Sequence, residues 1–391
     1  MLTIAQFTHT LGIALALLAT AYALLACLAE VMTAKRPRGS RASAYARTAS
    51  ASGFGTTEHW PPVTILKPLC GSEPNLYECL RSFCTQDHPC FQIVFGVHDG
   101  DDAALASVRR LQLEMPTQDI VVVIEPRLHG SNRKVSNLAN MLPAARHPIL
   151  VLSDSDVSVD AGYLRRVTAP LEDPTVGLVT SLYRARADDI AWSRLLAQFI
   201  NEWFMPAVRI AQLFGSASFT SGVTIALRRQ TLARLGGFDT FANVLADDYW
   251  LGERTRRLGL RNVVAEGVVE TLVAEPSLGA LCRHELRWLR TIRSVQPRGY
   301  IPLSISFTLP VAGLGVLLAG ANAAALGLLA VAIAARLLLH HLAAPRFMPW
   351  LVPGGDLLAF ALWCWSFASR RVRWREALFA VARDGSMQRS A

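Results

Sequence analysis

The sequence predicts an α/β domain, built on an open, mostly parallel sheet with helices on both faces and flanked at both ends by membrane helices. Two observations lead to this fold class. Between Pro61 and Gly299, short β-branched runs alternate with amphipathic stretches, as strands and helices do in α/β proteins. Outside this region the chain is strongly apolar, and its 391 residues are 52% hydrophobic with a mean hydropathy of +0.30, which is high for a wholly soluble protein.

The first apolar run, Leu11–Val31, is long enough to cross a bilayer. The alternative is a cleaved signal peptide, which needs basic residues before the run, and no Lys or Arg precedes Lys35. Basic residues follow the run instead, so the positive-inside rule places the amino terminus outside and the rest in the cytosol. We therefore expect residues 1–34 to be an uncleaved anchor and residues 35–60, rich in Ser, Ala, Gly and Arg, to be a flexible linker.

The central domain, residues 61–299, contains four runs that predict buried parallel strands: Val63–Leu66, Ile93–Val97, Ile120–Ile124 and Ile149–Leu152. Helices are predicted between them, for example over Asn75–Phe83 and Ala103–Leu113. In such sheets, ligands bind at the carboxyl ends of the strands. The residues that follow each strand are therefore the candidate site residues.

Residues 300–369 are predicted to be membrane helices. The apolar runs are Leu303–Ala319, Ala321–Leu339 and a weaker Leu351–Phe367, whose start is interrupted by Pro and Gly. Residues 370–391 form a basic tail that the positive-inside rule keeps in the cytosol. Three complete spans would put this tail outside, so we expect one segment to lie in the interface or to re-enter.

The net charge of +9 suits anionic lipid or a nucleotide diphosphate, and also nucleic acid. No zinc-finger, homeodomain or RNA-binding signature is present, so we expect no nucleic-acid partner. The seven cysteines include no CxxC pair. Four of them fall between Cys70 and Cys90, where a disulfide or metal cluster is the alternative to the reduced thiols that we expect.

Asp99 follows the second predicted strand, in the stretch His98-Asp99-Gly100-Asp101-Asp102. A carboxylate at this position can accept hydrogen bonds from a nucleotide base or ribose. A solvated Asp/Gly turn is the alternative.

After the third strand comes the stretch His129-Gly130-Ser131-Asn132-Arg133-Lys134-Val135-Ser136-Asn137-Leu138. Arg133 and Lys134 can neutralise phosphate charge, and the free N–H groups of a helix that starts here would also attract an anion. The alternative is a basic surface loop.

Asp154 and Asp156 follow the fourth strand, two residues apart. On a regular strand such residues share one face, where their charges repel unless a cation lies between them. A hard divalent ion with diphosphate oxygens in its shell meets that need. A DxD triplet alone is weak evidence for a metal site, but its place after a buried strand strengthens the prediction of such a site.

Asp247 and Asp248 open a predicted helix that extends to Leu258. Acids at a helix amino terminus are often only caps. Transfer of a group to a hydroxyl, however, requires a general base for that hydroxyl, and a carboxylate at the start of a helix can serve.

The stretch from Arg283 to Arg293 contains Arg287, which can clamp phosphate oxygens, and Trp288, which can stack on a sugar or lipid. The alternative is an amphipathic interfacial helix that holds anionic lipid through its arginines. Both interpretations are compatible, because this stretch leads directly into the membrane segments.

The order of these motifs, followed by membrane spans, resembles the processive and lipid-directed GT-A glycosyltransferases, and within them the ceramide glucosyltransferase family (glycosyltransferase family 21). The likeness covers nearly all of residues 61–300. The stretches that look closest to the bacterial hopanoid-biosynthesis branch are Lys67–Leu76, Gln86–Val97, Gly130–Leu138, Leu245–Glu253 and Arg283–Arg293. The resemblance implies a Rossmann-like GT-A domain that binds a nucleotide-diphospho-sugar.

The resemblance also implies roles for the matching residues. Asp99 would contact the uracil, and Lys134 and Asn137 would lie near the nucleotide. Asp154 and Asp156 would hold Mg²⁺ or Mn²⁺ on the UDP diphosphate. Asp248 would be the general base, with Asp247 beside it in the substrate site. Arg287 and Trp288 would complete the binding site for the diphosphate and the acceptor.

One position departs from the family pattern. The closing motif usually has Gln or Arg three residues before the Arg-Trp pair, and His284 stands there in this chain. Arg283 is one position earlier, so the role of the first residue of this motif stays open. His284 is included among the expected substrate-binding residues.

The implied reaction is an inverting displacement on a UDP-sugar by a lipid hydroxyl. The hopanoid branch would transfer N-acetylglucosamine from UDP-GlcNAc to a hopanoid polyol such as bacteriohopanetetrol, and the alternative is glucose transfer to ceramide. A polysaccharide synthase would usually have more spans, and a transporter would place acids inside them. We expect a multi-pass protein of the bacterial inner membrane, in contact with the lipid bilayer, with a cytosolic catalytic domain.

Overall fold

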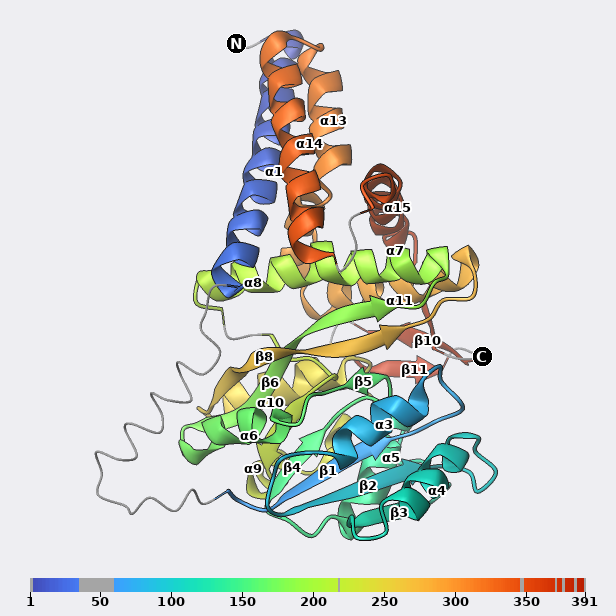
Figure 1. Cartoon of the computed structure of the whole chain (residues 1–391). Coiled ribbons are helices and arrows are strands. Elements are labelled where there is room, and N and C mark those ends of the chain that lie inside the picture. The colour runs from blue at the N-terminus through green and yellow to red at the C-terminus, as the bar shows by residue number, and fades with distance from the viewer. Residues whose placement is uncertain are drawn as a thin grey trace, which may run out of the picture.

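The computed structural model describes residues 3–34, 60–216, 219–344, 348–369, 371–374, 377–382 and 385–389. The predicted linker therefore lies outside the described residues, apart from Trp60. An eight-stranded sheet with the order β3-β2-β1-β4-β7-β6-β8-β5 forms the centre of the molecule (Figure 1). Its strands are β1 (Val63–Pro68), β2 (Phe91–Val97), β3 (Ile120–Ile124), β4 (Ile149–Leu152), β5 (Val157–Ser158), β6 (Val176–Ala187), β7 (Ile225–Arg228) and β8 (Arg261–Val273).

The four predicted strands are confirmed as β1 to β4, and they form a parallel half of the sheet. The prediction of a mostly parallel sheet is only partly right. Strand β7 pairs antiparallel with both β4 and β6, and β5 pairs antiparallel with β8, whereas β6 and β8 are parallel. The sequence does not mark β8 because exposed residues such as Arg261 and Glu270 interrupt its apolar pattern.

Helices cover both faces of the sheet, as predicted. Successive residues of β1 alternate between two cores, with Ile65 in one and Leu66 in the other. The helices of this domain are α3 (Leu76–Cys84), α4 (Ala104–Glu114), α5 (Arg133–Met141), η1 (Leu142–Ala144), α6 (Tyr163–Thr168), η2 (Ala169–Glu172), α9 (Arg229–Arg234), η4 (Phe238–Phe241), α10 (Asp247–Arg257) and α11 (Leu278–Val295).

Three helices stand upright side by side above this domain: α1 (Ile4–Ala34), α13 (Thr308–Ala319) and α14 (Ala323–Ala343) (Figure 1). Among the described residues, α1 and α14 are long and apolar enough to cross a membrane. Helix α13 adds a third candidate only when it is joined, across a bend of 78°, to Pro297–Ser306, which comprises α12 (Pro297–Tyr300) and η5 (Pro302–Ser306). Helix α15 (Leu351–Ser366) is shorter and lies beside the bundle, in contact with α11 and α13 (Figure 1). That one C-terminal segment does not cross the membrane remains a prediction.

A continuous helical stretch lies between the bundle and the sheet and consists of α7 (Ala191–Phe199), the π-helical turn η3 (Ile200–Phe204) and α8 (Met205–Leu213) (Figure 1). Buried charges tie it to the bundle. Arg336 Nη1 of α14 lies 2.6 Å from Glu202 Oε2 of η3, and its Nη2 lies 2.9 Å from Asp356 Oδ1 of α15. Arg209 of α8 forms an ion pair with Glu30 of α1.

The C-terminal residues, which were expected to be a basic tail, contain a second sheet. Its strands are β9 (Arg371–Trp374), β10 (Ala377–Val381) and β11 (Met387–Arg389), in the antiparallel order β11-β10-β9. We call this the C-terminal sheet. It lies beside α11, on the same side of the three-helix bundle as the central domain (Figure 1).

Candidate active site

The register of the sheet brings two turns together. Leu152, the last residue of β4, pairs with Ile225, the first residue of β7, and Ile225 pairs with Thr180 of β6. Because β4 and β7 are antiparallel, the turn that follows β4 lies beside the turn that precedes β7. The first turn carries Asp154, and the second, Ser221–Thr224, carries Gly222.

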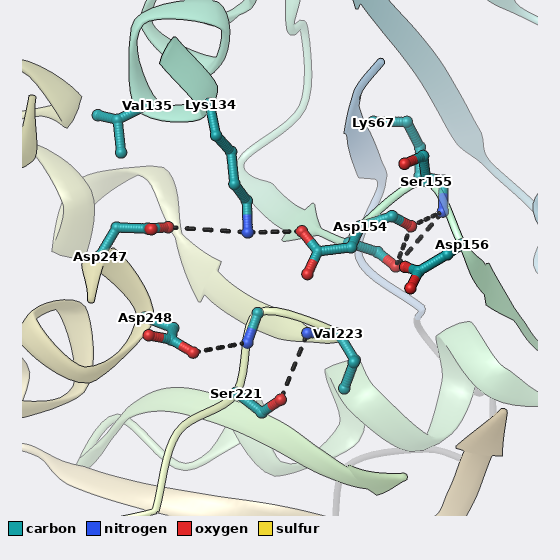
Figure 2. Close-up of polar contacts among 12 residues, drawn as sticks. Lys67, Lys134, Val135, Asp154, Ser155, Asp156, Ser221, Val223, Asp247 and Asp248 are labelled. Atoms are coloured by element: carbon teal, nitrogen blue, oxygen red, sulfur yellow. Dashed lines mark hydrogen bonds and ion pairs between the residues drawn. The ribbon is translucent and has the colours of Figure 1, made fainter. Parts of the chain in front are cut away.

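The Lys134 ammonium joins two of the predicted acidic motifs (Figure 2). Lys134 Nζ lies 2.5 Å from Asp154 Oδ1 and 3.8 Å from Asp247 Oδ2. Burial alone would lower the pKa of Lys134, but the Asp154 and Asp247 carboxylates outweigh it and raise the pKa. Lys134 is therefore a permanent positive charge between these motifs.

Asn132 places Lys134 by capping α5. Its Oδ1 accepts a hydrogen bond from Val135 N (3.1 Å), the usual N-cap contact. Its Nδ2 donates to Val244 O (2.9 Å) and to Asp247 Oδ1 (3.3 Å). The predicted helix start is confirmed, and the same residue also fixes the loop before α10.

The Asp248 carboxylate accepts a hydrogen bond from a residue outside its own helix, Gly222, which distinguishes it from a simple helix cap. Its Oδ2 accepts from Gly222 N (3.0 Å) and its Oδ1 from Tyr249 N (2.7 Å). Desolvation, followed by the charge of Asp247, raises the pKa of Asp248 to about 6. A carboxylate of this basicity can accept a proton from a hydroxyl group in a transition state.

Asp154 and Asp156 lie in a turn rather than on a strand, because β4 ends at Leu152. The predicted reason for their shared face is therefore wrong, and the two side chains have different partners. Asp154 binds Lys134, while Asp156 Oδ2 accepts from Thr271 Oγ1 (2.8 Å) of β8. Desolvation and the Asp154 and Glu73 carboxylates raise the pKa of Asp156 to about 7.

These acids suit a metal ion that arrives with a diphosphate. The repulsion on Asp156 is of the kind that a cation relieves. Within the described part of the chain, no group of three or more His, Cys, Asp or Glu side chains is arranged to hold a metal. The protein would thus supply Asp154 and Asp156, and Mg²⁺ is commonly held by one or two carboxylates plus substrate phosphates.

Lys67, directly after the first predicted strand segment, was not singled out from the sequence. It is fully buried, and its Nζ donates to Asp154 O (2.5 Å) while lying 3.7 Å from the centre of the Phe83 ring. Desolvation lowers its pKa to about 8. Lys67 thus holds the backbone of the DxD turn in place. The sequence feature that could have identified Lys67 is a cation at the end of an apolar strand.

Gly222 is a second residue that the sequence analysis missed. A Cβ added there would lie 2.9 Å from both Asp154 Oδ2 and Lys134 Nζ. The absence of a side chain therefore lets this turn approach the ion pair while its N–H binds Asp248. The only local signal is a Ser-Gly pair before an apolar run.

Asp99 and Asn137 form hydrogen bonds with other parts of the chain. Asp99 is exposed at the end of β2, and its Oδ1 accepts from Asp101 N (3.0 Å), a local turn contact. Asn137 is buried, and its Nδ2 donates to Gly96 O (2.8 Å), so it ties α5 to β2. Their expected nucleotide contacts remain predictions.

Helix α11 presents the last predicted motif. Burial lowers the pKa of the Arg287 guanidinium, and the charges of the Glu285 and Asp154 carboxylates partly offset this effect. His284 Nδ1 lies 2.7 Å from Glu275 Oε1, and its ring packs edge-on against Trp288 at 4.6 Å. His284 therefore orients Trp288. Desolvation lowers the pKa of His284.

The chain is similar to known glycosyltransferases. The profile of Glycosyl transferase family 21 matches residues 11–387. Ceramide glucosyltransferase 1 of Caenorhabditis elegans is 26% identical over 206 residues, 52% of this chain and 44% of that protein. Uncharacterized protein MT1568 of Mycobacterium tuberculosis is 27% identical over 216 residues, 52% of this chain and 64% of that protein. The match thus spans about half the length of the ceramide glucosyltransferases of Caenorhabditis elegans.

Solved structures give weaker likenesses. The mannosyltransferase PcManGT from Pyrobaculum calidifontis, in complex with GDP-Man and Mn2+, is 22% identical with a TM-score of 0.47, covering 90% of this chain and 97% of that one. Glucosyl-3-phosphoglycerate synthase from Mycobacterium tuberculosis is 18% identical with a TM-score of 0.39, covering 60% and 79%. At these scores neither likeness assigns a residue or a ligand to this chain.

Proposed function

We propose that this protein, which belongs to Glycosyl transferase family 21, transfers a sugar from a UDP-sugar to a hydroxyl group of a membrane lipid. The observation that carries the proposal is the position of Asp248. Its carboxylate shares Gly222 with the Lys134–Asp154 ion pair: the Gly222 N–H binds Asp248, and the Gly222 Cα faces the pair. The proposed base and the proposed diphosphate-binding cation therefore both lie next to this one glycine.

Asp248 is the proposed general base. It takes the proton from the lipid hydroxyl as that oxygen attacks the anomeric carbon of an α-linked UDP-sugar, and the product is a β-glycoside. The Gly222 and Tyr249 N–H groups hold the carboxylate in one orientation during this step. Asp247 keeps the basicity of Asp248 high through its charge.

Lys134 and Arg287 are the proposed stabilisers of the departing UDP. Negative charge builds on the diphosphate as the bond to the sugar breaks, and fixed cations close to it lower the barrier. Asp154 and Asp156 would hold Mg²⁺ or Mn²⁺, which supplies additional charge neutralisation on the diphosphate oxygens when it is bound. Trp288 would stack on the sugar or acceptor, with Asp99 and Asn137 toward the nucleoside.

For the substrates, we propose N-acetylglucosamine from UDP-GlcNAc and a hopanoid polyol such as bacteriohopanetetrol, as the resemblance of the motif stretches implies. Glucose transfer to ceramide is the second candidate, favoured by the name that the Caenorhabditis elegans relatives carry. Incubation of purified protein with each UDP-sugar and each lipid, followed by mass spectrometry, separates the two. A polysaccharide product would contradict both.

The proposed setting is the bacterial inner membrane, with the catalytic domain in the cytosol. The support is the basic stretch after the first span and the two apolar helices α1 and α14. Labelling of single exposed cysteines in intact cells and in inverted vesicles tests this orientation.

The central experiment is Asp248→Asn. Loss of the base should lower kcat by roughly 10²–10⁴-fold, whereas UDP affinity by titration calorimetry should stay nearly unchanged. The matched control is Asp101→Asn, an exposed acid in the turn after β2, which should keep its activity. If Asp248→Asn retains most of the wild-type rate, Asp248 is not the base.

A second variant tests the diphosphate side. Asp156→Ala should weaken UDP binding in the presence of Mn²⁺ but not in its absence, because the residue acts through the ion. Equal losses under both conditions would contradict the proposed ligand role of Asp156.

A further inference from the structure

The C-terminal sheet contacts the loop that carries the Asp247–Asp248 pair. Leu245 N donates to Gly385 O (3.2 Å), and Met387 N donates to Asn243 O (2.7 Å). Val244 and Ser386 form an antiparallel bridge between these two bonds. The strand-like contact therefore ends two residues before Asp247.

An apolar cluster reinforces this contact. Leu245 of the central domain is buried together with Val372 of β9, Phe379 of β10 and Met387 of β11. Leu245 thus fills the core of the C-terminal sheet. Without the sheet, an apolar side chain next to the acidic pair would be exposed to water.

Gly385 brings the backbone of the sheet against the first turn of α10. Its φ is +79°, and a Cβ added there would lie 2.6 Å from Trp250 Nε1. Trp250 is two residues after Asp248. The sheet therefore touches the chain on both sides of the acidic pair.

The opposite side of the same loop is held by the residues before α5. Asn132 N donates to Ala242 O (2.7 Å), and Ser131 N donates to Asn243 Oδ1 (2.9 Å). The loop between Ala242 and Ala246 is thus clamped between the element that presents Lys134 and the C-terminal sheet.

Helix α11 anchors the sheet from its other end. Arg290 Nη1 donates to Arg371 O (2.7 Å), the first residue of β9, and Arg293 donates to the carbonyls of Ser366 and Ser369 (2.6 Å each). Because α11 also carries Arg287 and Trp288, the sheet connects the acidic pair to this motif.

We propose that the C-terminal sheet is a positioning element of the active site, which fixes the loop Asn243–Ala246 and thereby the orientation of Asp248. This inference rests on the proposed role of Asp248 as the base. Catalytic groups need support from surrounding contacts to stay within a fraction of an ångström of their working position. A displacement of about 1 Å can cost roughly 100-fold in rate.

The test uses full-length variants that loosen the contact. Gly385→Ala introduces a clash with Trp250, and Leu245→Ala empties the apolar cluster. Each should lower kcat roughly 10- to 100-fold while the UDP affinity and the KM for the UDP-sugar stay near wild type. The matched control is Gly259→Ala, which has the same left-handed φ (+77°) but no atom within 4 Å of the added Cβ.

The readouts separate positioning from a general effect on folding. A selective loss of kcat in Gly385→Ala or Leu245→Ala, with UDP affinity and Tm close to those of Gly259→Ala, supports the proposal. Unchanged kcat overturns it, and so does a parallel fall of kcat, UDP affinity and Tm. If Gly385→Ala does not fold, Leu245→Ala decides by the same criteria, and its own failure to fold counts against a role limited to Asp248.

Failure of the proposed function gives a different result. If the wild-type protein transfers no sugar, or if Asp248→Asn keeps its activity, the proposed function fails before the sheet is tested. If Asp248→Asn behaves as proposed while both sheet variants keep full kcat, only the positioning role is overturned.

Discussion

Lys134 Nζ lies 2.5 Å from Oδ1 of Asp154, the first acid of the DxD turn. The ammonium group thereby occupies one oxygen of a proposed metal ligand. Lys134 Nζ also lies 3.8 Å from Asp247 Oδ2, so it links the proposed metal-binding motif to the proposed base motif. On the proposed function, Lys134 would compete with a free metal ion and would bind the diphosphate.

Lys134→Met should therefore change two affinities in opposite directions. Binding of Mn²⁺ alone should tighten, because Asp154 loses its competing cation. Binding of UDP should weaken by roughly 10- to 100-fold, the equivalent of a charge-assisted hydrogen bond of about 1.5–3 kcal/mol. Mn²⁺ titration by electron paramagnetic resonance and UDP calorimetry measure the two effects, with Lys134→Arg as the charge-retaining control. A loss of both affinities would mean that Lys134 only supports the fold.

The pH dependence of the reaction should report the pKa of Asp248. A base must be ionised, so kcat/KM should fall as the pH decreases through about 6, the raised pKa of this group. An ordinary aspartate would lose activity only near its usual pKa of about 3.9. Asp247→Asn removes a charge that raises this pKa, so the acidic limb should move to lower pH. An unmoved limb would assign it to another group, such as Asp156.

Gly222→Ala should impair activity without unfolding the protein. The new Cβ would lie 2.9 Å from Lys134 Nζ and from Asp154 Oδ2, so the ion pair or the turn must shift. We expect kcat/KM to fall at least tenfold, in line with the cost of a small displacement in an active site. Gly299→Ala, where no atom lies within 4 Å of the added Cβ, is the control that should behave like wild type. Equal activity of both variants would show that the turn tolerates a side chain.

Arg336→Met should destabilise the attachment of the membrane bundle to the catalytic domain. The substitution leaves the buried Asp356 carboxylate without its cation and leaves Glu202 with His340 alone, whose Nδ1 lies 2.7 Å from Glu202 Oε1. Removal of one partner of such a buried cluster costs about 3–5 kcal/mol. Thermal unfolding in nanodiscs should therefore show a lower Tm. The triple variant Arg336→Met, Glu202→Gln, Asp356→Asn should recover part of the loss, because neither buried side chain then carries a negative charge without its arginine.

An exposed ion pair provides the control for this experiment. Arg110 and Glu114 of α4 are joined at 2.7 Å but stand in solvent. Arg110→Met should leave Tm nearly unchanged, because water already screens the pair. If both arginine variants shift Tm equally, the buried cluster has no special structural role.

The sequence by itself determined the elements whose environment is local. The runs Val63–Leu66 and Ile149–Leu152 are apolar on both faces, which specifies buried strands, and acids after a strand specify the edge where a site can form. Asp154 became a candidate from this pattern, and the Asp247–Asp248 pair became one from its place at a predicted helix start. The choice of Asp248 as the base came only from the family resemblance.

Tertiary structure alone decided which of these residues meet. Antiparallel pairing of β7 with β4 brings Gly222 beside Asp154, and the C-terminal sheet reaches Leu245 from more than 100 residues away along the chain. Neither contact leaves a local signal, because periodicity records whether a residue is buried but not which distant strand covers it. The partners of the acidic residues depend on strand order and register, which result from the packing of the whole chain.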